Sequence, residues 1–191
     1  MARFRHFAFL ALVLAGNLAW AVEPVRVANE GGIKNAWTLP PGTRLPAPAY
    51  PPKFSDRALE VCVGIGYLLN ADGTTSHFAL LKGWNSESGE REPAAGFWAD
   101  FAQASAAALQ QWRFQPRPDV GRPVPVYTVA TMMFGKHGTA ASPELRRRCS
   151  IPHLAQHLAA IRSDPRKRRI LDTELFDRML LNPQDFAGPS Q

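Results

Sequence analysis

The chain has 191 residues, a length that fits one domain with appendages or two very small domains. Hydrophobic residues make up 46% of it, which is ordinary for a globular protein. The formal net charge is +6, and the first 21 residues hold two of the 22 basic residues and none of the 16 acidic ones. Without them, 20 basic residues face 16 acidic ones, and this excess of +4 is too mild to indicate a nucleic-acid partner.

The N-terminus has the features of an export signal. Arg3 and Arg5 form a basic start, and an apolar run over residues 7–20 ends in the small-residue motif Ala19-Trp20-Ala21. This arrangement predicts cleavage before Val22 and a periplasmic location. The alternative is an uncleaved membrane anchor, although a spanning helix needs roughly 20 apolar residues and this run is shorter and interrupted.

Residues 22–53 are rich in proline, glycine and small polar residues. The stretch LPPGTRLPAPAYPP is expected to be extended, with polyproline character and no packed core of its own. We interpret this segment as a strap lying on the domain or a tether leading to it.

A strand and a hairpin turn follow. Apolar residues alternate along residues 59–69, and Asp72-Gly73 is a strong hairpin signal before a return strand over residues 74–84. The side chains expected on the first face of the outgoing strand are Leu59, Val61, Val63, Ile65, Tyr67 and Leu69.

One clear helix is predicted over residues 97–113, because Phe97, Phe101, Ser105, Ala108 and Trp112 recur at spacings of three and four. Pro116 then ends it, and alternation predicts a last strand over residues 124–134. The order β-β-α-β predicts an α+β, two-layer domain, a three-stranded antiparallel sheet with one helix. Its expected core includes Trp112, Phe114, Phe101, Val63, Ile65 and Tyr67.

Residues 138–191 are predicted to form a helical extension. Ser150 is expected to cap one helix, and Asp164-Pro165 is expected to begin a second that ends at Asn182-Pro183. Leu171, Leu175 and Met179 would line one face of the second helix. The predicted organisation is therefore a signal (1–21), a strap (22–53), a domain (54–137) and an extension (138–191).

The two cysteines, Cys62 and Cys149, match in number a single disulfide, which export makes chemically feasible. Two buried free thiols are the alternative.

Three stretches together resemble the TonB C-terminal domain family: PAYPPKFSDRALEVCVGIGYLLNADG, AALQQWRFQP and GRPVPVYTVATMMF. The matching features are Tyr50-Pro51, Asp72-Gly73, Trp112-Arg113-Phe114 with Pro116, and the strand ending at Phe134. The resemblance covers about 90 residues, 48 to 136.

The resemblance implies the role of a peptide-binding module. In the family, this domain binds a short segment of an outer-membrane receptor as an added strand beside its final strand. Pro123 and Pro125 agree with an edge position for that strand. The implied peptide-binding residues here are Val124, Val126, Tyr127, Thr128, Val129, Ala130, Thr131, Met132 and Phe134.

The second face of the first strand departs from the charged or polar face usual in the family, since Cys62, Gly64, Gly66 and Leu68 are small or apolar. Such a face permits close approach by another element. We therefore expect tail helices to cover it, held by a Cys62–Cys149 bridge; a loose helical appendage is the alternative.

No residue pattern indicates catalysis, a metal site or a cofactor. His153 and His157 have a zinc-compatible spacing, but no third ligand is evident and we interpret them as surface residues. The basic runs at 146–148 and 166–169 could contact phosphates, yet such runs are usually solvated helix faces. Ser86, Glu87 and Ser88 have no paired histidine.

The favoured function is thus a periplasmic TonB-like module that binds an extended segment of an outer-membrane receptor or another envelope protein. It would take no cofactor, meet the membrane only through partners, and expose edges through which a homodimer could form. The alternatives are a structural envelope protein whose peptide site is occupied or lost, and an anchored energy transducer with an uncleaved N-terminus.

Overall fold

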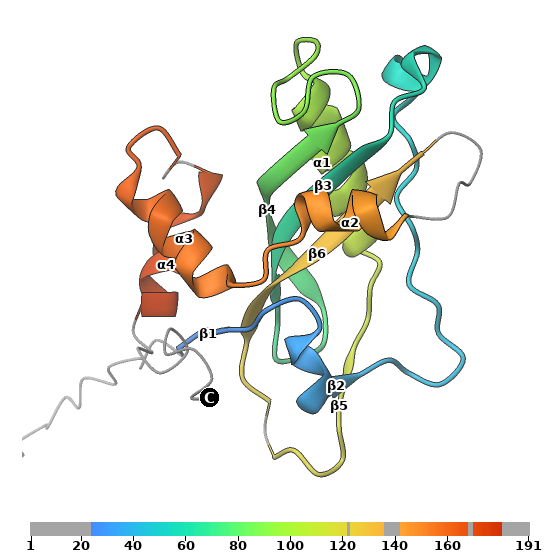
Figure 1. Ribbon diagram of the computed structural model, residues 1–191. Helices are drawn as coiled ribbons and strands as arrows, with labels where there is room; N and C mark the ends of the chain where they lie inside the picture. Colours follow the sequence, from blue (N-terminus) through green and yellow to red (C-terminus); the bar gives the residue numbers. More distant parts are fainter. Residues whose placement is uncertain (1–23, 122, 136–141, 168–169, 181–191) are drawn as a thin grey trace, which may run out of the picture.

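The computed structural model describes residues 24–121, 123–135, 142–167 and 170–180. The predicted signal and Asn182-Pro183 lie outside these ranges. Within them, no helix is long and apolar enough to span a membrane. The described part is a mixed α+β structure with helices on both faces of a curled sheet (Figure 1).

The main sheet has four strands in the order β1-β6-β3-β4. β3 (Val61–Leu69) lies in the centre and pairs antiparallel with β4 (Thr75–Asn85) and with β6 (Val126–Phe134). Every residue of β3 is buried, which explains why its second face also lacks charged side chains. The short strand β1 (Arg26–Val27) pairs parallel with β6 and was not expected, because two residues give no readable alternation.

The β3–β4 turn depends on its glycine. Gly73 has φ +83°, and a Cβ there would lie 1.9 Å from the carbonyl oxygen of Phe114. Asp72 closes the turn by accepting hydrogen bonds from the backbone N–H of Thr74 (2.9 Å) and from its hydroxyl (2.6 Å). These bonds lower the pKa of the Asp72 carboxyl, the bond from the Thr74 hydroxyl contributing most.

The first face of the sheet is covered by α1 (Phe97–Leu109). The buried stripe of α1 meets the side chains that β3 and β6 direct to this side. The cluster between the two layers contains Val63, Ile65, Tyr67, Phe97, Phe101, Leu109, Ala130, Met132 and Phe134.

The predicted helix end at residue 113 was wrong, because α1 stops at Leu109. The chain leaves the helix where contacts with distant segments replace helical bonds. The Trp112 indole N–H donates to the carbonyl of Pro46 (3.0 Å), and the N–H of Phe114 donates to the carbonyl of Gly73 (3.0 Å). Trp112 and Phe114 are half-buried at the margin of the core rather than enclosed in it.

The segment before β3 lies on the domain as a strap. After β1 it forms the short helix η1 (Gly32–Asn35), the strand β2 (Trp37–Thr38), which pairs with β5 (Gln115–Pro116), and the helix η2 (Pro52–Arg57). Although proline-rich, it buries Val25 and Trp37 against other elements.

The second face is covered by the C-terminal segment: α2 (Pro143–Cys149), α3 (Leu154–Ser163) and α4 (Thr173–Leu180). The predicted helix starts were wrong. Ser142 caps α2 by accepting a hydrogen bond from the N–H of Leu145, whereas Ser150 ends that helix. Asp172, not Asp164, accepts the N-terminal bond of α4.

A second apolar cluster joins these helices to the sheet. It includes Val25, Leu68, Ala79, Leu81, Tyr127, Val129, Ile151, Leu154, Leu158, Ile161, Leu171, Leu175, Phe176 and Met179.

The predicted disulfide between Cys62 and Cys149 is confirmed, with a Cα–Cα distance of 5.8 Å. It attaches α2 directly to the centre of the sheet. The glycines of β3 permit this close approach, since a Cβ on Gly64 would lie 3.0 Å from the carbonyl oxygen of Cys149 and one on Gly66 would lie 2.3 Å from the hydroxyl of Tyr127.

Candidate functional site

The outer edge of β6 is the candidate site that the sequence predicts, and its hydrogen bonds to β1 define its geometry. The carbonyls of Pro125 and Tyr127 accept from the N–H groups of Arg26 (3.0 Å) and Ala28 (2.9 Å). The backbone N–H and C=O groups of successive residues point to opposite sides of a strand. In β6, those of the odd-numbered residues therefore point away from β3. By the same alternation, the edge also carries the backbone groups of Val129, Thr131 and Met133.

β6 is a regular strand. Its pairing with β3 runs without a register shift from Val126 opposite Leu69 to Phe134 opposite Val61. The only strand that the described residues place on its other side is β1, which pairs at Arg26 and Val27 alone. Beyond that pairing, the edge offers backbone groups spaced as a ladder partner requires.

The segment after β1 stays beside this edge and contacts it through other groups. The Thr128 hydroxyl donates to the carbonyl of Asn29 (3.3 Å). The carboxylate of Glu30 accepts from the backbone N–H of Thr131 (3.0 Å) and from its hydroxyl (2.8 Å). The edge is therefore occupied by a β-ladder at its start and by a side chain at its middle.

Glu30 is also held from the second face of the sheet. Arg146 on α2 donates to its carboxylate at 3.0 Å, and the two side chains are 50% and 28% exposed. Burial and, to a smaller extent, the charge of Glu30 raise the pKa of Tyr67. Glu30 thus connects β6 to the helix that the disulfide anchors.

The opposite edge of the sheet, along β4, is less suited to strand addition. Its pairing with β3 shifts register twice, and His77 has a left-handed backbone conformation with φ 51°. Bulges, charged side chains and irregular backbone protect natural edges against pairing, and Lys82 adds a charge here. A hollow of about 520 Å³ lies beside this edge, where Trp98 and Ile170 are among the lining residues.

At the C-terminal end of β6, the strap places the aromatic side chain of Tyr50 beside Phe134. The ring of Tyr50 lies edge-on to Phe134, with centroids 6.3 Å apart, and to Phe101 at 5.1 Å. Its hydroxyl donates to the carbonyl of Leu59 at 3.3 Å. The predicted strap motif Tyr50-Pro51 therefore lies against the core side of β6.

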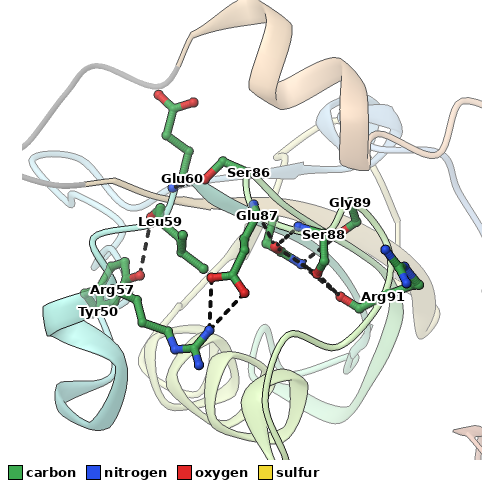
Figure 2. Close-up of polar contacts among 10 residues, drawn as sticks. Tyr50, Arg57, Leu59, Glu60, Ser86, Glu87, Ser88, Gly89 and Arg91 are labelled. Carbon is green, nitrogen blue, oxygen red and sulfur yellow. Dashed lines mark hydrogen bonds and ion pairs between the residues drawn. The ribbon is translucent and has the colours of Figure 1, made fainter.

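The polar loop after β4 is held by a network of hydrogen bonds and an ion pair (Figure 2). Asn85 is fully buried and donates to the Ser88 hydroxyl (3.1 Å) and the carbonyl of Gly89 (2.8 Å). Glu87 forms a two-point ion pair with Arg57 at 3.0 and 3.1 Å. The Asn85 bonds hold the loop together, and the Glu87–Arg57 ion pair attaches it to η2.

The remaining sequence candidates are separate from one another. The Nε2 atom of His157 lies 3.2 Å from the carbonyl oxygen of Leu81, while His153 precedes α3. Among the described residues, no group of three or more potential metal ligands occurs. The arginines of α2 all have partners: Arg146 pairs with Glu30, Arg147 pairs with Glu144, and Arg148 lies over the ring of Trp84.

The predicted edge residues lie on β6 with one exception. Val124 precedes the strand, which begins at Val126 because Pro123 and Pro125 cannot donate ladder bonds. Sequence reasoning missed Arg26, Ala28 and Glu30. The two residues of β1 give no readable alternation, and no sequence signal indicated that the Glu30 carboxylate would bind the N–H of Thr131.

No protein family and no curated protein matches the chain. Among solved structures, the solution NMR structure of the Pseudomonas aeruginosa TonB C-terminal domain matches 50% of this chain and 84% of its own, with 22% sequence identity and a TM-score of 0.38. This distant structural neighbour has a TonB-like fold. The likeness is too distant to indicate a function for this chain.

Proposed function

We propose that this protein is a periplasmic TonB-like binding module that receives an extended peptide segment along the outer edge of β6. The observation that carries the proposal is the regular register of β6 combined with a β1 pairing that stops at Val27. The tyrosine–proline strap, the Asp72-Gly73 hairpin and the Trp112-Arg113-Phe114 motif, which resemble the TonB C-terminal family, support it.

Recognition in this mode depends mainly on the backbone. The side chains of β6 are buried apart from the half-buried Met133, so an added strand would meet the N–H and C=O groups of the edge. Backbone bonds supply affinity in strand addition, and pockets for alternate side chains supply specificity. The partner class is therefore an extended segment of an outer-membrane receptor or another envelope protein, in a role related to TonB-dependent transport.

A disulfide of this kind agrees with an oxidising compartment such as the periplasm. A predicted export signal over residues 1–21 points to the same location. The proposal is of a binding role, because the groups that carry it are the backbone N–H and C=O groups of the β6 edge.

A second candidate is a structural envelope protein with the same fold and an occupied edge. It is favoured by one observation: residues 26–30 of the chain itself contact β6 where a peptide would lie. The two candidates differ in whether an external peptide can bind the edge.

The test is a titration of the isotope-labelled chain with peptides copying the periplasmic N-terminal segments of TonB-dependent outer-membrane receptors. We expect amide shifts centred on residues 128–134. Val129→Pro should abolish the shifts, because it removes an N–H that faces the edge and no bond to β3. Val129→Ala is the matched control, since it loses side-chain packing but keeps the N–H.

Shifts that lie elsewhere, or that persist in Val129→Pro, would exclude the proposed placement. An absence of shifts with every peptide in every variant would favour the structural candidate.

A further inference from the structure

The segment Val25–Glu30, here named the clasp, occupies the same backbone groups that a partner strand would need. Its backbone donates to β6 twice, through Arg26 and Ala28. The carboxylate of its last residue, Glu30, accepts a hydrogen bond from the backbone N–H of Thr131. An added strand places a carbonyl oxygen opposite such an outward N–H, so the Glu30 carboxylate stands where that carbonyl would be. Clasp and partner are mutually exclusive at this position.

Val25 and Val27 pack in the second apolar cluster, and the rest of the clasp is attached by contacts outside the apolar clusters. The cluster between α1 and the sheet contains no clasp residue. Arg26 is exposed, and in the Glu30–Arg146 pair the arginine is exposed and the glutamate is half-buried. Solvent-exposed ion pairs and edge bonds are among the least stable contacts of a fold, so this segment can detach while the layers stay packed.

The clasp also contacts the C-terminal helices. The side-chain oxygen of Asn29 accepts the N–H of Leu154 at the start of α3 (2.9 Å), and Val25 is fully buried in the cluster below those helices. Arg146 lies three residues before the disulfide cysteine Cys149. The disulfide-anchored helices therefore provide the second surface against which the clasp is held.

We propose that Val25–Glu30 is a tethered competitor that keeps the β6 edge closed until a partner strand displaces it. This inference rests on the proposed function of the same edge and adds its regulation. Because the clasp is part of the chain, its effective concentration is in the millimolar range typical of short tethers. The apparent affinity of a partner is reduced in proportion to the open fraction.

The test uses the oxidised full-length chain and a probe taken from the chain itself, the synthetic peptide PVRVANEG (residues 24–31). The first variant is Glu30→Ala, which removes one half-buried side chain. Glu144→Ala is its matched control, because Glu144 also pairs with arginines of α2 but does not contact β6. A second variant, Arg26→Pro with Ala28→Pro, removes the two backbone donors instead.

In Glu30→Ala, we expect the Thr131 amide to exchange with solvent roughly tenfold faster. The probe should bind roughly five- to tenfold more tightly than to wild type, with shifts on the β6 edge. The double proline variant should bind the probe at least as tightly as Glu30→Ala does. Glu144→Ala should have the same affinity for the probe as wild type. Unchanged Thr131 exchange and unchanged probe affinity in Glu30→Ala would overturn the inference.

The receptor-derived peptides separate this inference from the proposed function. If PVRVANEG binds the opened edge and no receptor peptide does, the clasp is a competitor and the proposed partner class is wrong. If receptor peptides shift β6 equally in wild type and in Glu30→Ala, the binding function stands and the clasp does not regulate it.

Discussion

Adding a single methyl group at Gly66 tests the contact between β3 and the second apolar cluster. A Cβ built there lies 2.3 Å from the hydroxyl oxygen of Tyr127, 2.8 Å from its Cζ atom and 2.9 Å from the Cδ1 atom of Leu81. Tyr127 is fully buried, and Gly66 is paired with strands on both sides, so neither can move freely. Gly66→Ala should therefore overpack the core.

The expected cost follows from two opposing effects. Overpacking a core typically destabilises by about 1–3 kcal/mol. Replacing a strand glycine with alanine recovers roughly 0.5–1 kcal/mol of backbone entropy. The free energy of unfolding of Gly66→Ala should thus fall by up to about 2.5 kcal/mol, with a mid-range value of about 1 kcal/mol.

Tyr127→Phe should have the opposite effect. Among the described residues, the buried hydroxyl of Tyr127 has no hydrogen-bond partner, and burial raises the pKa of this phenol. An unsatisfied buried polar group costs about 1–3 kcal/mol, so removing it should leave stability equal or higher. Tyr50→Phe is the control, because the Tyr50 hydroxyl donates to the carbonyl of Leu59 and its loss should destabilise.

The assay is urea unfolding of the two single variants and of the double variant Gly66→Ala/Tyr127→Phe. The double variant lacks the shortest contact, so the two changes should couple by about 1 kcal/mol or more. Gly121→Ala, where an added Cβ meets nothing within 4 Å, controls for the backbone effect of alanine. Additivity within about 0.5 kcal/mol would refute the contact between Gly66 and Tyr127.

Three further changes test the turn and the disulfide. Replacing both Cys62 and Cys149 by alanine opens a loop of sequence separation 87 and should lower the free energy of unfolding by about 4–5 kcal/mol, measured against the wild type with its bridge intact. A loss below about 1 kcal/mol would show that the bridge contributes little. Gly73→Ala should cost about 2–4 kcal/mol in the same assay, because φ is +83° and the Cβ collides with a backbone oxygen; no loss would mean that the turn has another conformation. The pKa of Asp72 is lower in the folded chain, so its contribution to stability is present at neutral pH and is lost as the pH falls from about 4 through the folded pKa. Asp72→Asn should therefore flatten the acid side of a stability–pH curve, and an unchanged curve would contradict the role of this carboxylate.

The sheet and its first helix could be predicted from local patterns. The alternation of apolar residues located β3 and β6, although both faces of each strand are buried almost throughout. Asp72-Gly73 located the hairpin, since few other residue pairs tolerate that backbone conformation. The small residues Gly64 and Gly66 even indicated which face another element would approach, and the Cys62–Cys149 bridge agrees.

Predictions failed where a bond to a distant segment decided the local structure. α1 ends early because Trp112 and Phe114 find partners in the strap and in the hairpin. The side chains of Ser142 and Asp172 accept the N-terminal bonds of α2 and α4, although Ser150 and Asp164 have equally suitable side chains. Residue type shows which positions can cap a helix, and the packing of the helices on the sheet decides which of these positions is used.

The features of the β6 edge likewise fall into those predictable from sequence and those that depend on tertiary contacts. Local patterns were enough to predict a regular final strand with prolines near an edge, because strand period and proline chemistry are local properties. The partial closure of that edge, in contrast, depends on contacts between segments far apart in the chain. Glu30 and Thr131 are 101 residues apart, and a hydrogen bond across that separation exists only once the layers, the disulfide and α2 have brought the strap beside β6.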